Sequence, residues 1–329
     1  MKGYKGYEKG LICRGKQYAA GEVFEEDSAE ICKSGMHFCK NPLDILDNYP
    51  LIDTNGNLTE FTEVEALDEA KTDDGKKFYT KKLKIGAKLS LSEFVKASFC
   101  VAYENIKAEA EKSADAETGG NYATLAGGNY ATLAGGDGAK LAGGYGAKLA
   151  GGYGAKLAGG ASATLAGGDF AELAGGDGAT LAGGDFAELA GGDGATLAGG
   201  YGATLAGGAS ATLAGGDFAE LAGGYGAKLA GGYGATLAGG YGATLAGGDR
   251  AKLAGGDRAK LAGGDRALIV GDNGSAAKSG IGSVILLVSR DAHSNITAYK
   301  AIKIDGKRYK ADVFYTLGTD GKVKAEGRR

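Results

Sequence analysis

The sequence predicts a mainly β fold, in which a β-solenoid of 16-residue coils carries a small α+β N-terminal domain and a C-terminal β cap. Two observations lead to this prediction. Glycine makes up 64 of the 329 residues, and through most of the chain it recurs with a strict period of eight, which is typical of a repeat architecture. Both prolines, Pro42 and Pro50, lie outside the repeat. Because glycine does not occupy every third position and proline is scarce, collagen is excluded.

Composition divides the chain into three segments. Residues 1–112 have an ordinary globular composition, residues 113–272 contain the repeat, and residues 273–329 return to an ordinary composition. We therefore expect an N-terminal domain, a solenoid and a C-terminal cap with these bounds.

The N-terminal segment mixes helix and strand signals. Asn41 followed by Pro42 predicts the start of a helix, with asparagine as the N-cap. Residues 61–67 and 78–85 alternate as strands do. A second helix is expected from Ser90 or Ser92, as N-cap, to about Lys112, and we expect it to cover the first coil of the solenoid, because an exposed sheet edge invites further pairing.

The repeat consists of 18 octads between residues 121 and 264, each of the form x-x-Ala-[Thr/Lys/Glu]-Leu-Ala-Gly-Gly. The Ala-x-Leu alternation has the period of a strand, with leucine inside and the residue at position 4 outside. Glycine pairs every eight residues would break a helix, whereas they suit the corners of a solenoid. One octad is too short to enclose a core, so two octads per coil are predicted, with Leu125, Leu141 and Leu157 in one internal stack.

Position 4 distinguishes two outer faces when the octads are numbered from Asn121. The odd octads carry a mixture of Thr, Lys and Glu, as a solvated face does. The even octads carry mostly threonine, which is either a water- or surface-binding row or the usual filling of exposed strand positions. The candidate binding residues on this even face are Thr132, Thr164, Thr180, Thr196, Thr212 and Thr244. Calcium binding is not expected, because the period is eight rather than nine and many turns lack an aspartate.

The end of the repeat changes character. Three octads carry Asp-Arg at positions 1 and 2 (Asp249-Arg250, Asp257-Arg258 and Asp265-Arg266), either as a ladder of surface ion pairs or as a clasp between molecules. Beyond them, residues 282–288 predict a buried strand, and residues 298–304 and 309–317 predict a hairpin around Asp305-Gly306. Residues 266–329 hold 12 Lys and Arg against 6 Asp and Glu, so the cap is basic.

The repeat resembles that of the bacterial ice-nucleation proteins. Gly200 to Gly207, the Gly-Asp-Arg-Ala-Lys-Leu coils that begin at Gly248 and Gly256, and Asp305 to Tyr309 are similar to that family's octapeptide, arginine-bearing coils and C-terminal segment. This resemblance implies a solenoid that assembles into oligomers or fibres through the arginine coils and the cap, where Lys307, Arg308 and Tyr309 are the further candidates. Two features differ from the family. Its Thr-x-Thr element is Thr-x-Ala here, and its single tyrosine ladder is divided between even octads (Tyr145, Tyr225) and odd octads (Tyr153, Tyr201).

The N-terminal segment holds the residues that could carry chemistry. Cys13, Cys32, His37 and Cys39 could bind zinc, although Cys-x4-His-x-Cys is not a usual zinc spacing and buried free cysteine is common. Gly35 to Phe38 and Asn41 to Tyr49, with Arg14 upstream, are faintly similar to the core of ADP-ribosyltransferase folds, which implies an enzyme acting on a nucleotide. A polar cleft around Arg14 and His37 would favour that alternative, and a packed domain without a cleft would favour a non-enzymatic adaptor.

The expected function is therefore that of a non-enzymatic structural or interaction protein without a cofactor, whose main partner is a second copy of itself and whose threonine row could bind ordered water or ice. The overall charge of −3 gives no general attraction to nucleic acid. No run of apolar residues is long enough to span a membrane, no secretory signal precedes the first segment, and four cysteines do not make a disulfide framework. These features predict a cytoplasmic protein.

Overall fold

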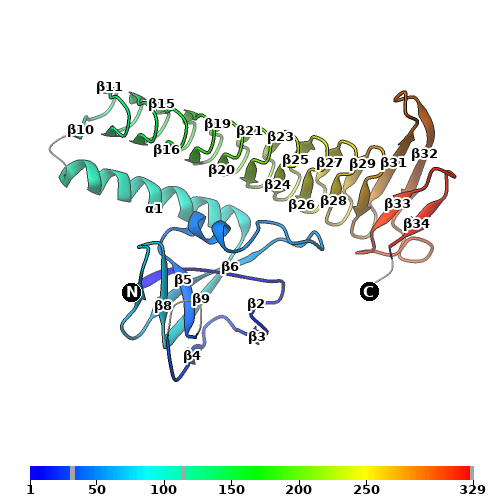
Figure 1. Ribbon diagram of the computed structural model, residues 1–329, viewed down its shortest axis with the longest axis horizontal. Helices are drawn as coiled ribbons and strands as arrows, with labels where there is room; N and C mark the ends of the chain where they lie inside the picture. The colour runs from blue at the N-terminus through cyan, green and yellow to red at the C-terminus, as the bar shows by residue number, and fades with distance from the viewer. Residues whose placement is uncertain (30–33, 113–115, 327–329) are drawn as a thin grey trace.

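The computed structural model describes residues 1–29, 34–112 and 116–326, and it confirms the predicted fold class. A long rod of stacked coils forms one part of the molecule, a small sheet domain forms the other, and a helix lies between them (Figure 1). No helix among the described residues is long and apolar enough to cross a membrane.

The N-terminal domain is built on a seven-stranded sheet with the order β4-β9-β6-β1-β5-β8-β7, in which neighbouring strands run antiparallel. Its strands are β1 (Lys2–Tyr7), β4 (Val23–Glu25), β5 (Met36–Cys39), β6 (Glu60–Ala66), β7 (Lys71–Thr72), β8 (Lys77–Thr80) and β9 (Lys82–Leu89). A small hairpin of β2 (Ile12–Cys13) and β3 (Lys16–Gln17) stands beside the sheet. Apolar residues are buried in separate clusters, one of which contacts the solenoid.

Two local predictions for this domain have different outcomes. Asn41 does cap a helix, a 3₁₀ helix η1 (Pro42–Asp47), because its side-chain oxygen accepts a hydrogen bond from the Leu43 N–H at 3.1 Å. The single strand expected over residues 78–85 is wrong. Asp68 accepts hydrogen bonds from the Thr80 hydroxyl and from the backbone N–H groups of residues 81 and 82, and this turn separates β8 from β9.

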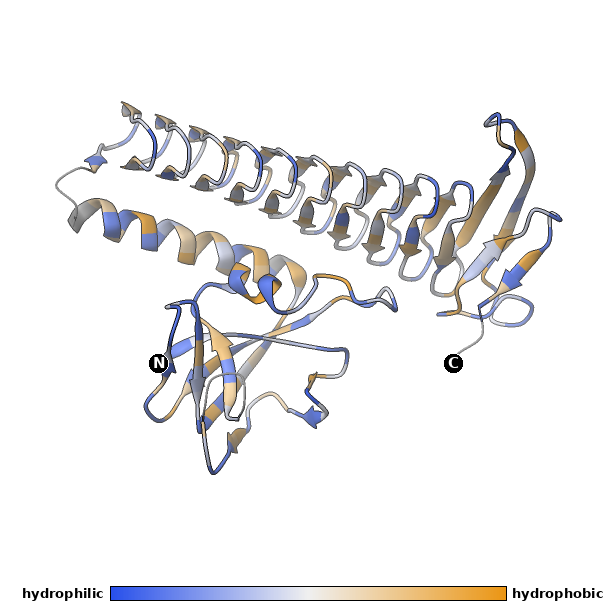
Figure 2. Cartoon of the chain, viewed as in Figure 1, coloured by the Kyte–Doolittle hydropathy of each residue, from blue (hydrophilic) through white to orange (hydrophobic). Residues whose placement is uncertain are grey.

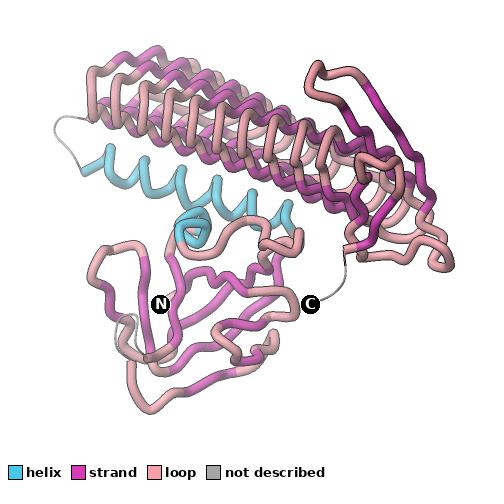
Figure 3. Tube along the Cα trace, turned by 45° about the vertical axis from the view of Figure 1, so that its right-hand side comes forward, coloured by secondary structure: helices cyan, strands magenta, loops and turns pink. Residues whose placement is uncertain are grey.

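The solenoid consists of about eleven coils of 16 residues, each of which contributes one strand to each of two parallel sheets (Figure 3). The even sheet contains β10 (Glu117–Thr118), β12 (Thr132–Ala134), β14 (Lys148–Ala150), β16 (Thr164–Gly167), β18 (Thr180–Gly183), β20 (Thr196–Gly199), β22 (Thr212–Gly215), β24 (Lys228–Gly231), β26 (Thr244–Gly247), β28 (Lys260–Ala262) and β30 (Ala276–Lys278). The odd sheet contains β11 (Thr124–Ala126), β13 (Lys140–Ala142), β15 (Lys156–Ala158), β17 (Glu172–Ala174), β19 (Glu188–Gly191), β21 (Thr204–Gly207), β23 (Glu220–Gly223), β25 (Thr236–Gly239), β27 (Lys252–Gly255), β29 (Leu268–Gly271) and β31 (Val284–Arg290). Both sheets thus continue the coils beyond residue 272.

The interior of the solenoid follows the predicted register. Leu125 pairs with Leu141 and Leu141 with Leu157 in neighbouring coils, and from Leu133 onward the repeat leucines are buried, together with the alanines at position 3 from Ala139 onward. Positions 4 and 6 point outward. The core is therefore a narrow column of leucine and alanine between the two sheets.

Helix α1 (Leu91–Lys112) begins as predicted, because the Ser90 hydroxyl accepts a hydrogen bond from the Glu93 N–H and the Glu93 carboxylate accepts one from the Ser90 N–H. It contacts the first coil at β12, as predicted, but it does not cover the end of the rod. The helix runs along the side of the solenoid and crosses the even sheet (Figure 1), where Ala102 and Ile106 pack on Ala150 and Ala166. The alanines at position 6 of the even strands offer a smooth apolar surface to the helix, whereas the first coil offers an edge with the half-exposed Leu125.

The predicted hairpin at the C-terminal end is also wrong. The buried strand β31 turns at Asp291, whose carboxylate accepts hydrogen bonds from the N–H groups of residues 293 and 295, and returns as β32 (Ile296–Lys303). The turn at Asp305 carries the chain from the odd sheet to the even sheet, where β33 (Tyr315–Leu317) and β34 (Val323–Ala325) pair in turn beyond β30. Antiparallel strands thus form this end of both sheets, with β32 and β34 as the edge strands. Figure 2 shows apolar residues along β31 and β32.

Candidate functional site

The threonine row of the even sheet is in register but is not an open surface. Thr164, Thr180, Thr196 and Thr212 lie opposite one another in successive coils, and these threonines, with Thr132 and Thr244, are half-buried. The adjacent row of alanines is covered by α1 and by the N-terminal domain, in which Leu43, Phe61 and Phe94 belong to the same buried cluster as Ala198 and Ala214. The position-6 alanines of the even sheet thus serve packing within the chain.

The odd sheet is the open face of the solenoid. Its position-4 side chains from Thr124 to Lys252 and its position-6 alanines from Ala126 to Ala254 are exposed. Lys156 and Glu172 form an ion pair at 2.6 Å on this face. The mixed charges agree with a solvated surface.

The aspartates and arginines of the last coils do not form the ladder of surface ion pairs that was one interpretation of the sequence. The Asp249 and Asp265 carboxylates accept hydrogen bonds at 2.8 Å from the N–H groups of residues 265 and 281 in the next coil. The Arg250 guanidinium lies over the Tyr233 ring, 5.5 Å from its centre, and that of Arg258 lies 5.6 Å from the centre of the Tyr241 ring. Asp249, Arg250, Arg258, Asp265 and Arg266 are exposed and Asp257 is half-exposed, and no ion pair between these aspartates and arginines occurs within the described residues.

The three candidate residues of the cap lie at its surface. Lys307 and Arg308 are exposed, and the Arg308 guanidinium lies 5.3 Å from the centre of the Tyr309 ring. Tyr309 in turn contacts the Tyr315 ring edge-on at 5.4 Å. These cations therefore extend the basic end of the rod.

A row of aromatic rings lies along one corner of the solenoid and was not predicted from the sequence. The rings of Tyr153, Phe170, Phe186, Tyr201, Phe218 and Tyr233 follow one another with centres 5.2–5.5 Å apart, Phe170 and Phe186 being stacked and the other neighbours tilted or edge-on. Tyr225 and Tyr241 stack at the opposite corner. The rings come from position 1 when it is Tyr and from position 2 when it is Phe, so tyrosine positions alone do not show the row. Arg250 and Arg258 each continue one of these sets of rings.

The proposed zinc ligands are not gathered around a common point in the part of the chain that the structure describes. Cys32 lies outside the described residues. Among the rest, no group of three or more His, Cys, Asp or Glu side chains could hold a metal. Cys13 and Cys39 are buried as free thiols, and burial raises the pKa of Cys39 to about 12.

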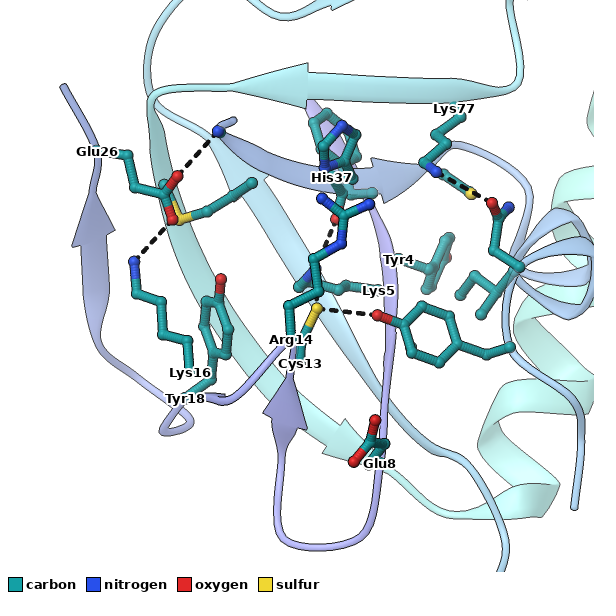
Figure 4. A pocket seen from close by; sticks show the side chains of 18 of the residues that line it. Tyr4, Lys5, Glu8, Cys13, Arg14, Lys16, Tyr18, Glu26, His37 and Lys77 are labelled. Carbon is teal, nitrogen blue, oxygen red and sulfur yellow. Dashed lines mark hydrogen bonds and ion pairs between the residues drawn. The ribbon is translucent and has the colours of Figure 1, made fainter. Parts of the chain in front are cut away.

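A cavity of about 510 Å³ opens in the N-terminal domain beside the β2–β3 hairpin (Figure 4). Lys5, Cys13, Arg14, His37 and Lys77 line it, although they come from three separate strands and from the β2–β3 hairpin. The further charged and aromatic lining residues are Tyr4, Glu8, Lys16, Tyr18, Glu26, Phe38 and Tyr49. The polar cleft around Arg14 and His37 that would favour an enzyme acting on a nucleotide is therefore present.

Hydrogen bonds hold the floor of this cavity. The buried Lys5 ammonium donates to the His37 carbonyl at 2.9 Å and to the Cys13 sulfur at 3.4 Å, and it lies 5.4 Å from the centres of the Tyr7 and Tyr18 rings. Burial lowers the pKa of Lys5. The Tyr49 hydroxyl lies 2.9 Å from the Cys13 sulfur.

The remaining charges make the cavity basic. Glu26 is engaged by Lys16 at 2.9 Å and by the Gly35 N–H at 2.9 Å, while Lys77 donates to the neutral Asn48 amide at 3.0 Å. Burial, followed by the charges of Lys77, Lys5 and Arg14, lowers the pKa of His37 to about 4. A cavity with this electrostatic character is suited to an anion.

Comparison with known proteins reaches only the N-terminal domain. Residues 1–97 match a family described as a domain of unknown function, DUF7666. No curated protein and no solved structure matches the chain. The match covers the sheet, the 3₁₀ helix and the lining of the cavity, so these features belong to a unit that occurs in other proteins.

Proposed function

We propose that this protein is a structural scaffold, a rigid β-solenoid similar to that of ice-nucleation proteins, which self-associates through its C-terminal arginine coils and cap. The observation that carries the proposal is the arrangement of Arg250, Arg258 and Arg266. Because Asp249 and Asp265 are engaged by backbone N–H groups, the exposed guanidinium groups remain available to acidic groups of a second copy. Glu188 and Glu220 on the open odd face are exposed acidic groups of this kind, whereas Glu172 is already paired with Lys156.

The two ends of the rod support the same proposal. At the N-terminal end, Leu125 on β11 is half-exposed, because α1 packs on the even sheet, at β10 and β12, and not on the end of the odd sheet. At the other end, β32 is an exposed edge strand of eight residues. Unpaired strand edges favour association with another chain. A water- or ice-binding role for the threonine row has less support, because the row is half-buried beside a covered surface.

Sedimentation velocity of the triple variant Arg250→Ala/Arg258→Ala/Arg266→Ala tests the proposal. Relative to the wild type at low salt, it is expected to shift toward smaller species. The matched control removes three charges elsewhere, as Lys96→Ala/Lys140→Ala/Lys228→Ala, all exposed, and is expected to sediment as the wild type does. An equal shift in both variants would show that only net charge matters, and the arginine clasp would be rejected.

A further inference from the structure

The tip of the β2–β3 hairpin has an unusual residue for its conformation. Cys13 pairs with Lys16, so Arg14 and Gly15 form a two-residue loop. Both have positive φ, 51° and 76°, which is the type I′ loop that favours Asn-Gly. A side chain as large as arginine is disfavoured there. Residues kept in such conformations cluster at functional sites.

The loop directs the Arg14 side chain over the cavity. Figure 4 shows its guanidinium reaching toward His37 above Lys5. Burial raises the pKa values of the Tyr18 and Tyr49 hydroxyls, and the nearby Arg14 charge opposes this effect in part. No carboxylate of the described residues forms an ion pair with this guanidinium.

The composition of the lining indicates what would bind. Four basic side chains (Lys5, Arg14, Lys16, Lys77) face two acidic ones (Glu8, Glu26), and Glu26 is already paired with Lys16. The surplus of positive charge matches a dianion. The volume of about 510 Å³ lies within the range of small-molecule sites, and the rings of Tyr4, Tyr18 and Tyr49 supply apolar walls.

We propose that this cavity binds a small organic phosphate, with the phosphate group on the Arg14 guanidinium and the organic part against Tyr18 and Tyr49. A guanidinium can donate two parallel hydrogen bonds to a phosphate, which a lysine ammonium cannot. This site goes beyond the scaffold role, and it would make the solenoid a carrier for a ligand-binding domain.

Isothermal titration calorimetry of the full chain with adenosine monophosphate tests the phosphate site. Adenosine is the uncharged comparison and inorganic phosphate the competitor. We expect adenosine monophosphate to bind, adenosine to bind at least about tenfold more weakly, a loss typical of one charge-assisted contact, and inorganic phosphate to displace the nucleotide. Equal affinities for adenosine and adenosine monophosphate would overturn the proposal. So would the absence of binding of either phosphate compound at about 10 mM, since a dissociation constant of that size corresponds to a binding free energy of only about 3 kcal/mol.

Two variants separate binding from folding. Arg14→Asn creates the favoured Asn-Gly loop, so its unfolding temperature should equal or exceed that of the wild type while its affinity falls at least about tenfold. Arg14→Lys keeps the charge and a long side chain without the fork, and is expected to bind more weakly than the wild type at an unchanged unfolding temperature. Lys81→Asn, at an exposed lysine outside the cavity, is the control for the lost charge. Unchanged affinity in Arg14→Asn would contradict the assignment.

Discussion

The Asp185 carboxylate accepts a hydrogen bond from the backbone N–H of Tyr201, one coil further along the chain, at 2.8 Å. The same contact joins Asn121 to residue 137 and Asp265 to residue 281. The first residue of the octad thus closes a corner by bonding to the next coil. Aspartate and asparagine serve equally here, because only one side-chain oxygen is used.

The corner contact predicts a clear difference between two substitutions. Asp185→Ala should lower the free energy of unfolding of the solenoid by about 1 kcal/mol, the usual net value of one such hydrogen bond. Asp185→Asn should leave it nearly unchanged, since Asn121 and Asn129 make the same contact. Guanidinium chloride unfolding followed by circular dichroism measures both. Equal losses would show that the charge, rather than the hydrogen bond, matters.

The leucine column predicts a larger loss in the core. Leu197 is fully buried, so Leu197→Ala should cost about 2–5 kcal/mol of unfolding free energy. Thr196→Ala, at the outward neighbour in the same strand, is the matched control and should cost less than about 1 kcal/mol, as surface changes do. A loss below 1 kcal/mol for Leu197→Ala would mean that the inner and outer positions are reversed.

The covered alanine row predicts that the two sheets respond differently to a bulky side chain. Ala198→Phe should weaken the docking of the N-terminal domain, because Ala198 is fully buried against it. Ala190→Phe, at the exposed equivalent on the odd sheet, should have little effect. Small-angle X-ray scattering would show a larger radius of gyration for the first variant alone. Identical radii for both variants would contradict the docking interface.

The depressed pKa of His37 predicts acid sensitivity of the N-terminal domain. The folded-state pKa is about 4, below the ordinary value of about 6.5, so between these values the unfolded chain binds more protons. Stability is therefore lost as the pH falls from about 6.5 toward 4. His37→Gln should reduce this pH dependence, as measured by near-ultraviolet circular dichroism of the tyrosines. Parallel pH profiles for the wild type and the variant would contradict the assignment of this acid sensitivity to His37.

The solenoid could be predicted from the sequence because every coil repeats one local pattern, so the pairing of Leu125 with Leu141 follows from the period alone. The position of α1 could not, since Ala150 on the even sheet and Ala158 on the odd sheet have identical local sequences and only the packed helix distinguishes them. The lining of the cavity could not be predicted in detail either, because Lys5 and Lys77 are brought to the same cavity by long-range strand pairing. The aromatic row left a signal in the spacing of Tyr153, Phe170 and Phe186, which are 16 or 17 residues apart.

The salt dependence of assembly tests the scaffold account most directly. Charge pairing through exposed arginines weakens with ionic strength, since the screening length falls from about 8 Å at physiological salt to about 3 Å at 1 M. Sedimentation velocity of the wild-type chain over this range is expected to show oligomers or short filaments at low salt that become smaller as salt rises. A monomer at every salt concentration would contradict self-association through the arginine coils.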